Sequence, residues 1–214
     1  MLQFAYCDYK YRMKNLVFLF LLVFSAQILG QGLQFKFNQD INVSNGKEIL
    51  KNPWAGGLNA AQFSQIDLNG DGIEDVLAFD RTNQKVFTYV NKSILGGAIS
   101  LVYDPIYEKY FPFIENWLIV SDFDGDKRKD LFMSTSAGVK VYRNISVGSN
   151  LKFEVVSEAL FSEGFSGKIN MYVAASDIPA IGDLDGDGDI DILSFEPGGH
   201  YLEFHKNMSI EKTG

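Results

Sequence analysis

The sequence contains few of the side chains on which thiol and nucleophilic chemistry depend. It has one cysteine, Cys7, and two histidines, His200 and His205, among its 214 residues. Cys7 precedes the apolar segment described below, so an exported form of the chain has no disulfide and no thiol nucleophile. The histidines match no serine or acidic constellation, and we interpret them as surface residues on or beside a predicted strand.

Positive charge is also scarce. The chain has 19 Lys and Arg against 27 Asp and Glu, which gives a formal net charge of −8. Recognition of phosphates requires a surplus of Lys and Arg, and the sequence has no phosphate-binding glycine loop, so we expect no nucleic-acid partner. An acidic surface suits cation binding, which makes the placement of the acidic residues the important question.

The one long apolar run lies at residues 16–24. Its length is that of the apolar core of a signal peptide and is short for a membrane span. We therefore predict an upstream extension at 1–12 and an export signal at 13–30, cleaved after Ala26 or Gly30. The alternative is an uncleaved N-terminal anchor. Export implies a secreted or cell-surface protein without membrane contact after cleavage.

The most informative feature that is present is a repeat. Three nine-residue acidic segments align without gaps at residues 67–75, 122–130 and 183–191, and their starts are 55 and 61 residues apart. This period is too long for most helical repeats and suits a β-propeller blade with long loops. The hydrophobic content of 46% and the aromatic content of 14% indicate a packed core rather than a disordered chain.

The flanks of the acidic segments repeat as well. Each segment follows a short apolar stretch and precedes an apolar strand, a turn and a further strand. These further strands end on Asn91, Asn144 and Asn207. Short β-rich runs between turn residues predict strands, and no sustained helical period occurs. Residues 151–156 alternate as an additional outer strand would.

The acidic segments place oxygen-bearing side chains at alternate positions. If the first Asp is position 1, then positions 1, 3, 5 and 9 offer carboxylate or amide oxygens, and position 7 can offer its backbone carbonyl. The predicted side-chain ligands are Asp67, Asn69, Asp71, Asp75, Asp122, Asp124, Asp126, Asp130, Asp183, Asp185, Asp187 and Asp191. The predicted carbonyl donors are Ile73, Arg128 and Asp189. Glycines at position 4, and in two segments at position 6, allow the loop to curl tightly.

Such clustered carboxylates repel one another unless a cation neutralises them. Ligation by oxygen alone favours Ca²⁺ over zinc or copper, so we predict up to three Ca²⁺ ions. One alternative is an acidic turn that uses Asp and Gly only as turn formers, but three copies in register argue against it. An EF-hand is disfavoured because its twelfth position is acidic and its flanks are helical. Position 12 is here occupied by Ala78, Met133 and Ser194.

The pattern Asp-x-[Asp/Asn]-Gly-Asp-Gly-x-x-Asp, followed by an apolar strand at blade spacing, resembles the FG-GAP/VCBS repeat family, which includes integrin-α-like propeller repeats. The resemblance covers about residues 55–210 and implies a β-propeller with Ca²⁺ in a hairpin loop of each motif-bearing blade. Together with the export signal, it looks like a secreted bacterial type. The second segment departs from the pattern, because Lys127 replaces the glycine of position 6. We expect its site to be the weakest.

We therefore predict an all-β fold, a β-propeller segment spanning residues 31–214. Its three recognisable blades correspond to repeats near 55–91, 110–144 and 172–207. Closed propellers usually have at least four blades. We favour a fragment of a longer product with further blades; the alternatives are closure by self-association and an additional degenerate blade.

The expected function is that of a binding module, a calcium-binding propeller that presents loops to an unknown protein or glycan ligand, as in cell adhesion. The alternative is a non-catalytic propeller domain of a larger secreted enzyme, for example one that degrades polysaccharides. No convincing acid and base pair occurs outside the predicted metal ligands, so we do not expect this chain to be an enzyme.

Two other features have competing interpretations. Six aromatic residues either pack in the core and between blades, which we favour, or line a ligand-binding rim: Trp54, Tyr107, Tyr110, Phe111, Phe113 and Trp117. Four Asn-x-Ser sequons begin at Asn42, Asn91, Asn144 and Asn207. Three of the four share one repeat position, so we attribute them to the repeat rather than to glycosylation.

Overall fold

The computed structural model of the chain describes residues 35–36, 38, 40–94, 97–164 and 167–210. The chain divides into two units, Met1–Ile41 and Asn42–Gly214, and the strands lie in the second unit. The predicted upstream extension, the export signal and Cys7 lie outside the described residues. Within the described ranges, no helical segment has the length and apolar character of a membrane span.

The first sheet contains four antiparallel strands in sequence order. They are β3 (Ala61–Ile66), β4 (Asp75–Asp80), β5 (Lys85–Asn91) and β6 (Leu101–Tyr103). The central strand β4 is buried along almost its whole length. A strand that is covered on both faces needs apolar side chains at successive positions, which explains why its sequence does not alternate.

The second sheet repeats this arrangement. It contains β7 (Glu115–Ser121), β8 (Asp130–Thr135), β9 (Gly138–Asn144) and β10 (Phe153–Ser157). Strand β8 is buried like β4. Strand β10 pairs with β9 and confirms the outer strand that was predicted near residues 151–156.

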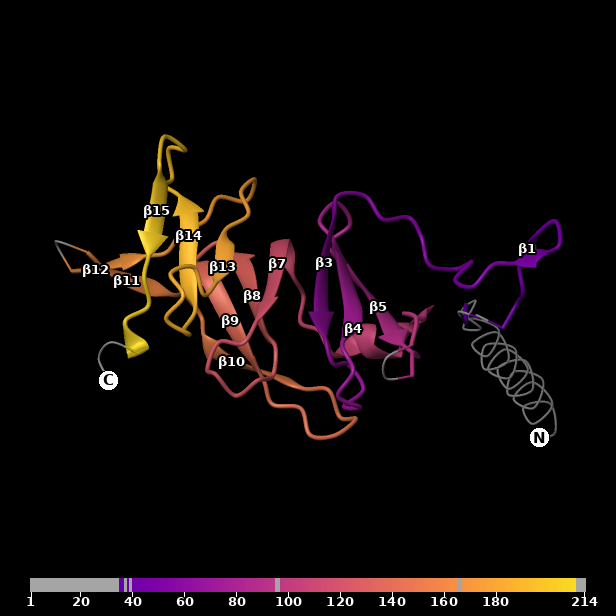
Figure 1. Cartoon of the computed structure of the whole chain (residues 1–214). Coiled ribbons are helices and arrows are strands. Elements are labelled where there is room, and N and C mark those ends of the chain that lie inside the picture. The colour runs from indigo at the N-terminus through magenta and orange to yellow at the C-terminus, as the bar shows by residue number, and fades with distance from the viewer. Residues whose placement is uncertain (1–34, 37, 39, 95–96, 165–166, 211–214) are drawn as a thin grey trace, which may run out of the picture. The chain divides into compact units, whose positions relative to one another are not determined.

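The third sheet has three described strands. They are β13 (Ala180–Gly182), β14 (Asp191–Phe195) and β15 (Leu202–His205). Figure 1 shows the three sheets following one another in chain order, from the indigo and magenta strands to the yellow ones.

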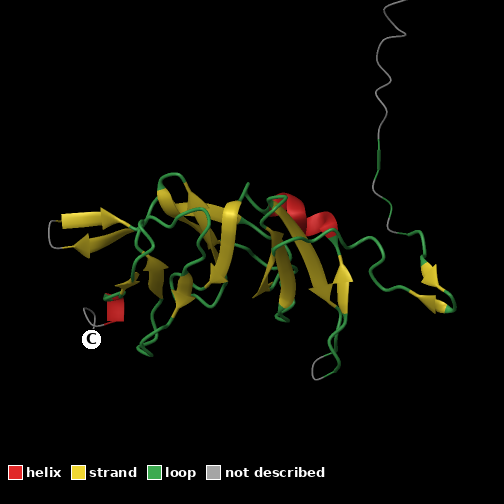
Figure 2. Cartoon of the chain, turned by 90° about the horizontal axis from the view of Figure 1, so that it is seen from above, coloured by secondary structure: helices red, strands yellow, loops and turns green. Residues whose placement is uncertain are grey.

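Three short features were not predicted. Two hairpins join β1 (Ser44–Asn45) to β2 (Glu48–Ile49) and β11 (Phe161–Gly164) to β12 (Gly167–Asn170). A 3₁₀ helix, η1 (Pro105–Tyr110), follows β6 and is drawn in red in Figure 2. Figures 1 and 2 both show the hairpin of β11 and β12 extending away from the three sheets.

The first two sheets share one hydrophobic core. Leu77 and Phe79 of β4 pack in the same buried cluster as Leu118 of β7 and Leu131 and Met133 of β8. All five side chains are at most 3% exposed. Burial of a side chain of this size contributes about 1.5–3 kcal/mol, so this contact is a main source of stability.

The second sheet packs through its other face toward the third. Trp117, Phe132, Val139 and Val141 form a buried cluster against which Ile181 of β13 packs. Each sheet therefore covers the next one along the chain, as neighbouring blades of a propeller do. The all-β fold and the blade-like sheets confirm the predicted fold class.

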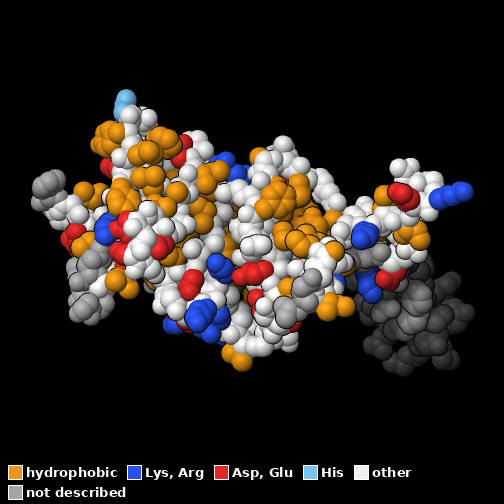
Figure 3. Space-filling view, in the orientation of Figure 1, with side chains coloured by type: hydrophobic (Ala, Val, Ile, Leu, Met, Phe, Trp, Pro, Cys, Tyr) orange, Lys and Arg blue, Asp and Glu red, His pale blue; other side chains and the backbone are white. Residues whose placement is uncertain are grey.

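In the first two sheets one face is buried against the next sheet along the chain, and in the third sheet the corresponding face is exposed. Leu202 occupies the repeat position of Val86 and Val139, five residues before the repeated asparagine of each repeat. Val86 is 8% exposed and Val139 is 0% exposed, whereas Leu202 is 53% exposed and its neighbours Phe195 and Phe204 are 45% and 50% exposed. Figure 3 shows apolar side chains in orange gathered over this sheet.

The six aromatic residues singled out from the sequence separate into two groups. Trp117 is fully buried, and Tyr107 and Phe111 pack against the core between the first two sheets, which confirms the packing interpretation for these three. The other three are partly or largely exposed: Trp54 at 41%, Tyr110 at 41% and Phe113 at 69%.

Candidate metal centres

Each acidic segment forms the loop between the first and second strands of its sheet. The three loops connect β3 to β4, β7 to β8 and β13 to β14. Their backbones curl through positive φ angles at positions 4 and 6, as the glycines there predict. In the second loop Lys127 itself adopts φ 71°, where the other loops have Gly72 at 80° and Gly188 at 99°. A side chain in this region costs about 1 kcal/mol or more.

The carboxylate at position 1 holds the curl together. Asp67 accepts hydrogen bonds from the backbone N–H groups of Gly70 at 2.7 Å and Gly72 at 2.9 Å, one on each oxygen. The same pair of bonds recurs at Asp122 and at Asp183, with lengths between 2.7 and 3.1 Å. The loop shape is thus encoded by the same residue that was predicted as the first metal ligand.

The carboxylate at position 9 is fully buried in all three loops. One oxygen of Asp75 accepts the backbone N–H of Leu68 at 2.8 Å, and the other accepts that of Asn91 at 2.7 Å. Asp130 and Asp191 make the corresponding pairs of bonds. This aspartate therefore clamps the start of the loop to the end of the third strand.

Burial raises the pKa of Asp75 and of Asp130 above the ordinary value. The two backbone hydrogen bonds to each carboxylate oppose this shift, and the neighbouring loop carboxylates add to it. A bound cation would favour the ionised form of such a group.

The repeated asparagine, which ends β5 and β9 and follows β15, is a structural residue that sequence reasoning did not assign. Its Oδ1 accepts the backbone N–H of the serine two residues later, as at Asn91, Asn144 and Asn207. The Nδ2 of Asn144 also donates to the carbonyl of Lys129 at 3.1 Å. The recurrence of the Asn-x-Ser sequence at one repeat position was the signal, and it reflects this turn.

The oxygens of positions 1, 3 and 9 meet in the second and third loops. Oxygens of Asp122, Asp124 and Asp130 all lie within 4.8 Å of one another, and those of Asp183, Asp185 and Asp191 do the same. In the first loop position 3 is Asn69, whose amide donates a hydrogen bond to Oδ2 of Asp71 at 2.9 Å.

These donor sets fit a hard divalent cation. They contain only oxygen, and each hydrogen-bonded carboxylate oxygen keeps a further lone pair for an ion. In the third loop, Oδ1 of Asp189 is buried without a hydrogen-bond partner among the described residues.

Positions 5 and 7 are less tightly gathered. The carboxylates of Asp71, Asp126 and Asp187 each accept the backbone N–H of position 7. The side chain of Asp189 instead accepts hydrogen bonds from Oγ of Ser209 at 2.7 Å and from the N–H of Ile210 at 3.2 Å. Ligation by position 5 and by the carbonyls of Ile73, Arg128 and Asp189 stays a prediction.

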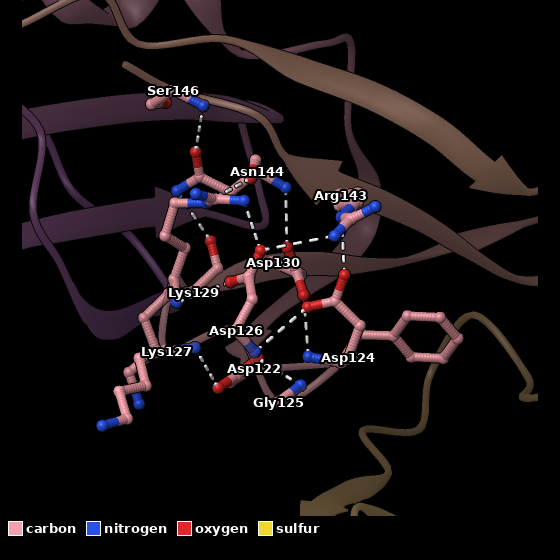
Figure 4. A network of polar contacts seen from close by, with 12 residues as sticks. Asp122, Asp124, Gly125, Asp126, Lys127, Lys129, Asp130, Arg143, Asn144 and Ser146 are labelled. Carbon is pink, nitrogen blue, oxygen red and sulfur yellow. Dashed lines mark hydrogen bonds and ion pairs between the residues drawn. The ribbon is translucent and has the colours of Figure 1, made fainter. Parts of the chain in front are cut away.

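Basic side chains contact the second and third loops. Nε of Arg143 lies 2.5 Å from Oδ2 of Asp124, and its Nη2 lies 3.5 Å from Asp126. Nζ of Lys206 pairs with Asp185 and lies 3.3 Å from Asp187. Figure 4 shows Arg143 directed at the carboxylates of the second loop.

A second cation also contacts the second loop. Arg128 pairs with Asp126, and its Nε donates to the carbonyl of Asn144 at 2.9 Å. The cation at position 7 therefore competes for the position 5 carboxylate, in addition to the unfavourable backbone angle of Lys127. That this loop holds an ion least strongly stays a prediction.

Comparison with known proteins finds a match to one family model, over part of the chain. A model described as an FG-GAP-like repeat matches residues 122–194, from the first residue of the second loop through most of β14. No curated protein and no solved structure matches the chain significantly. The first loop, residues 67–75, lies outside the matched segment but has the same position 1 and position 9 hydrogen bonds.

Proposed function

We propose that this chain is a secreted, calcium-binding β-propeller module that binds a protein or glycan ligand and is not itself an enzyme. The observation that carries the calcium part is the meeting of three carboxylates, from positions 1, 3 and 9, in each of two loops. The FG-GAP-like repeat match over residues 122–194 supports the same interpretation. Secretion is supported by the apolar run at residues 16–24 alone.

The ions would be held by the carboxylates at positions 1, 3, 5 and 9, with Asn69 replacing one carboxylate in the first loop. A divalent cation would supply positive charge that offsets the repulsion among these groups. The position 9 aspartates join each loop to the end of a third strand, so ion binding would stiffen the sheet as well as the loop.

A thermal melt tests the calcium part of the proposal. The chain is compared in EGTA, in millimolar Ca²⁺ and in millimolar Mg²⁺. An ion at about 100 times its dissociation constant stabilises by about 2.7 kcal/mol, which should raise Tm by roughly 5 °C or more in Ca²⁺. Asp183→Ala should reduce the difference between the Ca²⁺ and EGTA melts.

The matched control is Asp177→Ala, which removes a partly exposed carboxylate outside the loops, ahead of β13. It should leave the difference between the two melts unchanged. Cooperative melts that do not respond to Ca²⁺ would contradict the calcium proposal and favour the interpretation of the loops as simple acidic turns.

We place the proposed ligand-binding site in a pocket beside η1. This open pocket of about 440 Å³ is lined by Glu108, Lys109, Phe111, Pro112 and Phe113, among other residues. An exposed aromatic ring next to polar side chains is a common platform for sugars and peptides.

Binding to an array of immobilised polysaccharides and peptides tests this placement. Phe113→Ala should weaken binding severalfold without lowering Tm, because the ring is 69% exposed. The matched control is Phe63→Ala, since Phe63 is 66% exposed on β3. If both substitutions weaken binding equally, the pocket beside η1 is not the binding site.

A further inference from the structure

A basic residue precedes the repeated asparagine in two of the three repeats. Arg143 precedes Asn144 on β9, and Lys206 precedes Asn207 just after β15. The first repeat has Val90 at this position, and Val90 is fully buried. The repeat therefore offers the same site on its third strand for either a cation or an apolar side chain.

The two basic residues contact the same positions of their loops. Arg143 reaches Asp124 and Asp126, and Lys206 reaches Asp185 and Asp187, which are positions 3 and 5 in both cases. These carboxylates are 21–26% exposed, so the ion pairs are partly shielded from solvent. Partial shielding makes such a pair stronger than one on the open surface.

If only positions 1, 3, 5 and 9 and the residue before the repeated asparagine are counted, the three repeats carry the same net charge; Arg128 in the second loop and Asp189 in the third lie outside this count. The second and third loops have four carboxylates at positions 1, 3, 5 and 9, and one cation on the third strand leaves three negative charges. The first loop has Asn69 at position 3 and Val90 on the strand, so its three carboxylates also leave three negative charges. The additional carboxylate and the additional cation occur together.

We propose that Arg143 and Lys206 are resident counter-cations of the second and third loops. They neutralise positions 3 and 5 when no divalent ion is bound, and they leave these carboxylates when one binds. This inference rests on the proposed calcium function and assigns a role to two residues outside the loops. The first loop, which has Val90 in their place, depends on the ion alone.

The role requires two effects of opposite sign when the cation is removed. Without the cation, four carboxylates repel one another, so the ion-free protein becomes less stable. With Ca²⁺ present, no side chain competes for the carboxylates, so the ion binds more tightly. A basic residue that only packed against the sheet would lower stability equally in both conditions.

The substitutions Arg143→Met and Lys206→Met test the counter-cation role. The full sequence is expressed, and the chain that is recovered is measured. Each variant should melt at a lower temperature in EGTA and show a larger rise on addition of Ca²⁺ than the unaltered chain. Calorimetric titration with Ca²⁺ should show one class of sites tightened by about threefold to tenfold, as expected from loss of a competing ion pair.

The matched control is Lys140→Met, also on β9. Nζ of Lys140 lies 2.8 Å from Oε2 of Glu158 and does not pair with a loop carboxylate within the described residues. This substitution should lower the EGTA and Ca²⁺ melts equally and leave the Ca²⁺ affinity unchanged.

The outcomes separate this inference from the function on which it rests. If the unaltered chain does not respond to Ca²⁺, the calcium function itself is overturned. If the unaltered chain responds but Arg143→Met and Lys206→Met behave like Lys140→Met, only the counter-cation role is overturned. Weaker Ca²⁺ binding in these variants would likewise overturn it, because the basic residues would then support the bound state.

Discussion

The three glycines at position 4 of the loops have similar backbones but different surroundings. Their φ angles are 75° at Gly70, 77° at Gly125 and 85° at Gly186. A Cβ on Gly70 would overlap the backbone of Gly148, in the turn that follows β9. A Cβ on either of the other two would meet open space. The first loop is therefore packed closely against the second sheet's turn.

Gly70→Ala should accordingly destabilise the protein far more than Gly125→Ala or Gly186→Ala. The latter two substitutions incur only the cost of a left-handed alanine, about 1 kcal/mol. Gly70→Ala adds a clash with backbone, which should bring the loss in the free energy of unfolding to about 3 kcal/mol or more. Urea unfolding in EGTA measures all three values. Similar losses at the three sites would contradict the close approach of Gly70 to Gly148.

At the residue scale, the repeated nine-residue acidic segment was enough to predict which oxygens and which glycines form the loops. Each loop is a local structure, so its residues are close in the sequence as well as in space. The counter-cations Arg143 and Lys206 and the contact with Gly148 could not be predicted in this way. These contacts are made between residues of different strands or different repeats, and a local sequence pattern does not show which distant residues lie close together in space.

At the scale of elements, the central strands were the easiest to predict. Strands β4, β8 and β14 are largely buried, and their continuous apolar sequences follow acidic loops that mark where each strand begins. Strands β11 and β12 were missed because they are mostly exposed, so no apolar pattern marks them. The short helix η1 was missed because six residues are too few for a helical period.

Strand β15 contains a histidine whose environment differs from the predicted surface position. His205 pairs across the sheet with Ile192, and its side chain is only 11% exposed. Burial lowers the pKa of His205, and the charge of Glu203 opposes that shift. The interpretation of this histidine as a surface residue was therefore wrong, whereas His200 is exposed as predicted.

The stability of the chain should fall as the pH is lowered through about 6.5, the ordinary pKa of histidine. In the window between that value and the lower pKa of the folded state, the unfolded chain binds more protons at His205, so acid favours unfolding. His205→Gln should flatten this part of the pH dependence, measured as the free energy of unfolding in EGTA between about pH 7.5 and pH 5.5.

His200→Gln serves as the control, because it changes the other histidine, which is exposed and lies 2.8 Å from Glu196. If this substitution flattens the pH dependence and His205→Gln does not, the slope arises in the loop and not in β15.

At the scale of the whole molecule, the sheets stabilise one another in sequence. Val86, Val139 and Leu202 occupy the same repeat position, yet the first two are buried against the next sheet and the third is 53% exposed. The stacking of sheets could be predicted from the repeat. The sequence did not predict which sheet faces are covered. The same residue pattern is buried where another sheet packs against it and exposed where none does.

Alanine substitutions at this position should have different effects on stability in the three sheets. Val86→Ala and Val139→Ala should each cost about 2 kcal/mol in the free energy of unfolding, because they leave a cavity between sheets. Leu202→Ala should cost less than about 0.5 kcal/mol, although it removes a larger side chain. Urea unfolding at low protein concentration provides the values.

The size of the chain in solution, measured on the same samples, provides the check on Leu202. A cost at Leu202 as large as that at Val139, in a particle the size of one chain, would mean that the exposed face is covered within the chain itself.

The clamp at position 9 also has a consequence for the order in which the protein folds. Its two hydrogen bonds close over 7 residues and over 14–16 residues in every repeat. Short closures have a low entropic cost and form early, whereas contacts between sheets join residues much farther apart in the chain. Each repeat can therefore complete its polar clamp as soon as it emerges during synthesis. The apolar face of that repeat is then ready, and stays open to solvent until the following repeat arrives to cover it.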